Sequence, residues 1–113
     1  MRMNTDKSIV GERTDEQAIE DGALIPLYLL PGLGPVNRVT RAVFVHFVGD
    51  KAFEPMPLIE MAKALKPLIA AIRAMLAISP DRDGWRTGPY RDKRLWLVPN
   101  EVGGLTLMFP EEC

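Results

Sequence analysis

The sequence predicts a single α+β domain, in which two to three helices pack on one face of a small antiparallel sheet with a C-terminal β-hairpin. Residues 57–77 carry an unbroken apolar repeat at helical spacing. Residues 95–98 and 105–109 are short apolar runs typical of covered strands, and a glycine-containing connection joins them. Packing a helix on such a hairpin is an economical way to bury both apolar faces.

Length and composition place the chain among soluble globular proteins. Its 113 residues are 47% hydrophobic and 26% charged, enough for one self-contained core. The net charge of −1 argues against a dedicated nucleic-acid binder. Because Cys113 is the only cysteine, no disulfide within the chain is expected, and we predict a reducing cytoplasm as its compartment. We expect no secretory signal and no membrane partner.

The N-terminal part divides into a polar tail and a short helix. Residues 1–13 have no pattern and predict a flexible N-terminus, so the domain spans residues 14–113. Thr14 and Gln17 form a capping-box pattern that predicts a helix ending at Gly22. Residues 23–28 are extended in character, and Pro26 places them at a sheet edge or a bulge, because proline cannot donate to a strand ladder.

Residues 36–48 fit two patterns. Their valines and phenylalanine recur at helical spacing, while the second half also alternates as a strand would. We predict a helix, because the polar residues of the segment fall on one side and Gly49 stands where a helix-ending glycine belongs. Residues 31–35 before it are a loop by composition, and residues 50–56 connect it to the long helix.

The long helix over 57–77 is the element around which the fold is expected to form. Leu65, Leu68 and Ile72 lie on its apolar stripe and are predicted to be almost fully buried. Pro67 lies on the polar side, where it removes one backbone hydrogen bond. A kinked single helix and two helices that meet near Lys66 both fit this position.

Residues 81–94 form an exposed loop or irregular strand by composition, and arginines alternate with aromatic residues along it. Arginine, tryptophan and tyrosine dominate binding hot spots because each buries much area and keeps a polar group. Five basic and three acidic side chains leave the segment at +2, which favours a protein partner over nucleic acid. The alternative is a solvated loop whose tryptophan folds back onto the core. The predicted partner-binding residues are Arg82, Trp85, Arg86, Tyr90, Arg91 and Arg94.

No catalytic, cofactor-binding or metal-binding residues are predicted. Glu20 and Asp21 are adjacent carboxylates without a second cluster at ligand spacing. The single histidine, His46, has no acidic or nucleophilic neighbour in the sequence. Gly32 and Gly34 imitate the start of a dinucleotide-binding loop, but the third glycine is absent.

Three segments carry a resemblance to a known family. They are AIEDGALI at 18–25, PVNRVTRAV at 35–43 and LTLMFPEE at 105–112. In these segments the chain resembles an uncharacterised small-protein family, a domain of unknown function, carried largely by bacterial plasmids, phages and integrated elements. The match is thin from 50 to 94, and no activity or catalytic residue comes with it. What it implies is a setting, that of an accessory protein of mobile DNA.

These observations together predict a non-enzymatic, cytoplasmic accessory protein that a phage or plasmid encodes and that binds a host or defence protein. An anti-CRISPR-type inhibitor is one specific form of this hypothesis. The alternative is a weak nucleic-acid-binding accessory protein of mobile DNA. The sequence leaves the oligomeric state and the identity of the partner open.

Overall fold

The computed structural model describes residues 14–27 and 33–112, so the predicted flexible tail at 1–13 and Cys113 lie outside the described residues. The predicted α+β class is confirmed. In chain order the elements are α1 (Asp15–Glu20), β1 (Leu24–Pro26), β2 (Val36–Thr40), α2 (Arg41–Val48), η1 (Asp50–Phe53), α3 (Leu58–Leu76), β3 (Arg86–Tyr90), β4 (Lys93–Pro99), β5 (Leu105–Met108) and η2 (Pro110–Glu112).

The five strands form one sheet in the order β1-β2-β5-β4-β3. Neighbouring strands are antiparallel except β2 and β5, which are parallel. The sheet is therefore mixed, whereas the sequence predicted a wholly antiparallel sheet. No local pattern signals this pairing, because α2, α3, β3 and β4 all lie between the two strands in the chain. Each edge strand contains a proline, Pro26 in β1 and Pro89 in β3, which limits pairing with another chain.

The helix predicted over 36–48 is correct only for its second part. The first part is strand β2, and α2 begins after Thr40, whose hydroxyl accepts a hydrogen bond from the Val43 N–H at 3.4 Å. Helical spacing was misleading here because Val39 faces the core from a strand, while Arg38, which the sequence placed on a wet face, is buried. Tertiary pairing with β5 therefore overrides the local periodicity.

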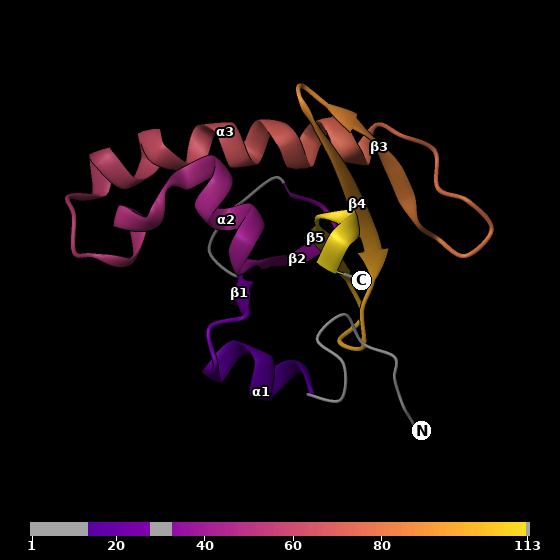
Figure 1. Cartoon of the computed structure of the whole chain (residues 1–113), viewed down its shortest axis with the longest axis horizontal. Helices are drawn as coiled ribbons and strands as arrows, with labels where there is room; N and C mark the ends of the chain where they lie inside the picture. Colours follow the sequence, from indigo (N-terminus) through magenta and orange to yellow (C-terminus); the bar gives the residue numbers. More distant parts are fainter. Residues whose placement is uncertain (1–13, 28–32, 113) are drawn as a thin grey trace.

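The segment at 57–77 is one helix, α3, with Pro67 exposed inside it, so the two-helix alternative is excluded. Leu68 and Ile72 are fully buried, as predicted. Leu65 is only partly buried, against that prediction, because α3 begins to leave the core at this turn. Figure 1 shows α3 running along one side of the sheet beside α2, with α1 on the opposite side.

The main core lies between α2, α3 and the facing side of the sheet. Each of these elements contributes side chains of 0% exposure, so the layers are in direct contact. These fully buried apolar residues of the main core are Val39, Val43, Leu68, Ala71, Ile72, Leu95, Leu97 and Leu107.

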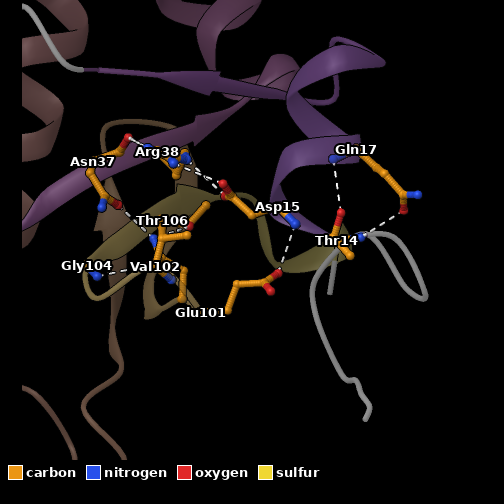
Figure 2. Close-up of polar contacts among 10 residues, drawn as sticks. Thr14, Asp15, Gln17, Asn37, Arg38, Glu101, Val102, Gly104 and Thr106 are labelled. Atoms are coloured by element: carbon orange, nitrogen blue, oxygen red, sulfur yellow. Dashed lines mark hydrogen bonds and ion pairs between the residues drawn. The ribbon is translucent and has the colours of Figure 1, made fainter. Parts of the chain in front are cut away.

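A buried ion pair joins α1 to the other face of the sheet (Figure 2). The Arg38 guanidinium donates from Nε and from Nη2 to the two carboxylate oxygens of Asp15, each at 2.9 Å. The side chains are only 6% and 10% exposed. Glu101 adds a contact from the β4–β5 connection, since its Oε1 accepts from the Asp15 N–H at 2.9 Å. The predicted capping box of Thr14 and Gln17 is present and starts α1 at this position.

Asn100 organises the connection between β4 and β5. Its Nδ2 donates to Asn37 Oδ1 at 2.8 Å and to Thr106 Oγ1 at 3.0 Å, while its Oδ1 accepts from the N–H groups of Val102 and Gly104 (Figure 2). A Cβ atom at Gly104 would meet the Asn37 side chain at 2.5 Å, so this approach requires glycine. The network ties β2 to the connection that positions β5.

Leu68→Ala should lower the free energy of unfolding by about 2–5 kcal/mol, because the side chain is fully buried and its loss leaves a cavity. Leu58→Ala is a matched control in the same helix, since Leu58 is 82% exposed, and it should change stability by less than about 0.5 kcal/mol. Urea denaturation in dilute solution measures both. Equal losses for the two variants would contradict the described position of α3.

Asp15→Ala should cost about 3–5 kcal/mol, because it leaves the Arg38 guanidinium buried without its carboxylate. Glu16→Ala is the control, since Glu16 is an exposed acid in the same first turn of α1. The double variant Asp15→Ala with Arg38→Met should lose less than the sum of the single losses, because it removes both charges together. Strict additivity in denaturant melts would show that the pair does not couple α1 to the sheet.

Candidate interaction surface

The six predicted partner-binding residues lie on and beside the β-ribbon of β3 and β4. Arg82 and Trp85 precede β3, Arg86 and Tyr90 belong to β3, Arg91 is in the turn, and Arg94 is in β4. The strands pair in antiparallel register from Arg86 opposite Leu97 to Tyr90 opposite Lys93. Residues 86–90, for which the composition suggested a loop or irregular strand, are thus a regular edge strand.

The turn before β3 is ordered by one aspartate. The Oδ1 atom of Asp81 accepts hydrogen bonds from the N–H groups of Asp83 at 2.8 Å and of Trp85 at 3.0 Å. The Asp81 N–H in turn donates to the Trp85 carbonyl at 2.9 Å. Trp85 is therefore held in place by its own backbone bonds before any partner arrives.

Two of the six residues, Arg86 and Tyr90, face the side of the sheet that α2 and α3 cover. The Nε of Arg86 donates to the carbonyl of Ile78, just after α3, at 2.9 Å. The ring of Tyr90 meets that of Phe47 in α2 edge to face, with centroids 5.8 Å apart, and packs against the main core. These contacts attach the β-ribbon to α2 and to the end of α3.

Trp85 and Trp96 form an aromatic pair on the face of the sheet that points away from α2 and α3. Their ring centroids are 5.3 Å apart, and both side chains are half-buried. Trp96 lies on this face because Leu95 and Leu97 on either side of it belong to the main core. Trp85 is thus neither fully exposed nor part of the core. It packs on Trp96 and does not belong to the main core.

Arg94 lies on the same face as Trp96, two residues before it in β4, and is exposed. Arg82 is exposed in the turn that leads to Trp85. We refer to Arg82, Trp85, Arg94 and Trp96 as the Trp–Arg surface. Sequence reasoning missed Trp96, although its place between two buried leucines in a strand was a readable signal.

Arg91 has an unusual backbone conformation. Its φ angle is 58°, and it is the one non-glycine residue at positive φ among the residues that the structure describes. A side chain in this region costs roughly 1–2 kcal/mol. The side chain is exposed at the tip of the β-ribbon, and its guanidinium carbon is 5.6 Å from the Tyr90 ring centroid.

The residues weighed for possible chemistry in the sequence include Glu20, Asp21 and His46. Within residues 14–27 and 33–112, no group of three or more His, Cys, Asp or Glu side chains could hold a metal ion. His46 is exposed and contacts the Phe47 and Phe109 rings edge to face, at centroid distances of 4.7 and 5.6 Å. Glu20 and Asp21 are exposed at the end of α1. None of the described helices has the length and apolar character needed to cross a membrane.

No protein-family model, curated protein or solved structure matches the chain.

Arg91→Gly should raise the free energy of unfolding by about 1 kcal/mol, because glycine adopts positive φ without steric cost. Arg94→Gly, three residues further on, is the control. Arg94 is exposed in a regular strand, where glycine should instead cost roughly 0.5–1 kcal/mol. Opposite signs for the two substitutions in denaturant melts are expected, and a loss for both would contradict strain at the turn.

Proposed function

We propose that this protein is a non-enzymatic accessory protein, encoded by a phage or plasmid, that binds a host or defence protein in the bacterial cytoplasm. The observation that carries the proposal is the Trp85–Trp96 pair, which lies on the face of the β-ribbon away from α2 and α3, with the exposed Arg94 on the same face. The mobile-element setting rests on the sequence resemblance alone. An anti-CRISPR-type inhibitor is one specific form of this function.

Side-chain chemistry supports a protein partner at the Trp–Arg surface. Tryptophan and arginine are the residue types most enriched at binding hot spots, since each covers a large area and keeps hydrogen-bond donors. Both tryptophan side chains are half-buried and packed against each other, so little rotamer entropy remains to be lost on binding. An ordered aromatic centre with a rim of exposed arginines fits the usual anatomy of such a site.

The charge of residues 81–94 indicates the charge of the partner's surface. The segment 81–94 has a net charge of +2. One of its three aspartates, Asp81, uses a carboxylate oxygen to accept backbone hydrogen bonds within the turn. Arg82, Arg91 and Arg94 remain exposed. A partner with carboxylates opposite these arginines would gain charge-assisted hydrogen bonds, so we infer an acidic protein surface.

Weak binding of single-stranded nucleic acid is the alternative function, because tryptophan rings on a sheet face can also stack bases. The Trp85–Trp96 pair favours this alternative as well. The net charge of +2 over the segment argues against it, since phosphate neutralisation supplies most non-specific affinity for nucleic acid. The two functions differ in how affinity depends on salt. Affinity falls steeply with increasing salt only for nucleic acid.

The test is affinity capture from a bacterial lysate with mass spectrometry, followed by titration of the purified partner. Trp85→Ala with Arg94→Ala should weaken binding by about 2 kcal/mol or more, roughly thirtyfold, and should lower the melting temperature only moderately, because Trp85 packs on Trp96 outside the main core. Arg86→Ala with Tyr90→Ala is the matched control. It should lower the melting temperature, because both side chains attach the β-ribbon to the helices.

Full-strength capture by the folded Trp85→Ala, Arg94→Ala variant would place the interface elsewhere. A titration with an oligothymidylate at increasing salt distinguishes nucleic-acid binding from binding of a protein partner. Submillimolar binding that weakens steeply with salt, and that the same double variant abolishes, would favour nucleic acid over the protein partner.

A further inference from the structure

The segment between α3 and β3 is a closed loop. The chain leaves α3 at Leu76 and enters β3 at Arg86. The Arg86 Nε donates to the carbonyl of Ile78 at 2.9 Å, so one hydrogen bond joins the two ends of the segment. We refer to residues 78–86 as the Asp81 loop. Its ends are held together by Arg86, independently of the Asp81 side chain.

One side-chain oxygen orders the inside of the Asp81 loop. Asp81 Oδ1 accepts from the N–H groups of Asp83 at 2.8 Å and of Trp85 at 3.0 Å. The Asp81 N–H donates to the Trp85 carbonyl at 2.9 Å, and the Asp81 carbonyl accepts from the Gly84 N–H at 3.0 Å. Both backbone polar groups of Trp85 are therefore bonded to Asp81, and the N–H of Trp85 depends on the carboxylate.

The loop lies against β4 at Gly84. The φ angle of Gly84 is 85°, and a Cβ atom there would be 3.2 Å from the Cγ of Pro99 at the end of β4. The next residue, Trp85, meets Trp96 of β4, with ring centroids 5.3 Å apart and ring planes at 60°. Contact with β4 thus sets where the loop lies, while the hydrogen bonds of Asp81 set its shape.

We propose that Asp81 is the positioning residue of the Trp–Arg surface, and that its Oδ1 holds Trp85 against Trp96 as a hydrogen-bond acceptor and not through its charge. This inference rests on the proposed function, because it names the residue that prepares that surface for a partner. The exposed charge of Asp81 opposes an acidic partner, whereas its acceptor oxygen lowers the cost of ordering Trp85 on binding. The two effects have opposite signs, so substitutions can separate them.

Three variants of equal net charge test the proposal. Asp81→Asn removes the charge but keeps the side-chain oxygen that accepts the two N–H groups. Asp81→Ala removes the charge and the acceptor together. Asp83→Ala is the matched control, since it removes one charge from the same loop while Asp83 contributes only its N–H to the hydrogen bonds there.

Circular dichroism of the full chain reads the tryptophan pair directly. The chain contains 2 tryptophans, Trp85 and Trp96, and indole rings this close give an exciton couplet. The wild type, Asp81→Asn and Asp83→Ala should show the couplet, and Trp96→Phe should abolish it. Asp81→Ala should lose most of it, and acrylamide should quench its tryptophan emission more strongly. All variants should keep a cooperative urea transition, because the Asp81 loop lies outside the main core.

A wild-type chain without the couplet, or a folded Asp81→Ala variant that retains it in full, would overturn the proposal. So would an Asp81→Asn variant that loses the couplet as Asp81→Ala does, because the charge would then be responsible. Titration of the protein purified after lysate capture adds a functional readout. Asp81→Asn and Asp83→Ala should bind at least as tightly as the wild type, and Asp81→Ala about tenfold more weakly. A lysate that yields no partner contradicts the proposed function, while the spectra still decide the role of Asp81.

Discussion

The insertion of β5 between β2 and β4 is the constraint on which the rest of the structure depends. All four residues of β5 are buried, and the strand pairs in parallel with β2 and in antiparallel with β4. This joins the N-terminal elements to the C-terminal β-ribbon within one sheet. A two-stranded ribbon is marginally stable alone, so β3 and β4 depend on β5 for the rigidity that any binding surface on them requires.

The polar contacts on the second face maintain this arrangement. Arg38 binds Asp15 of α1 from β2, while Asn100 connects Asn37 of β2 with Thr106 of β5. Hydrogen bonds of this kind demand one geometry, because a buried polar group without a partner is costly. The apolar core on the first face tolerates more variation in shape than these contacts do. Together they specify the register in which the two halves of the chain meet.

Part of the proposed interaction surface was accessible to sequence reasoning. The alternation of arginines and aromatics in the sequence included Arg82 and Arg94, which are exposed, and Trp85, which is half-buried against Trp96. The same pattern also included Arg86 and Tyr90, which point toward the helices. Residue type alone cannot separate these groups, because the face on which each side chain lies depends on the register of β3 with β4.

The sequence by itself determined the α+β class, the capping box at Thr14, the long helix and the edge position of Pro26, because each depends on neighbouring residues or on a period repeated over several turns. Only the tertiary structure decided that residues 36–40 form a strand, that Arg38 is buried and that Leu58 is exposed. Helical periodicity shows which side of a helix is apolar. It does not show which part of that side other elements of the fold bury. That limit is set by contacts between residues far apart in the chain.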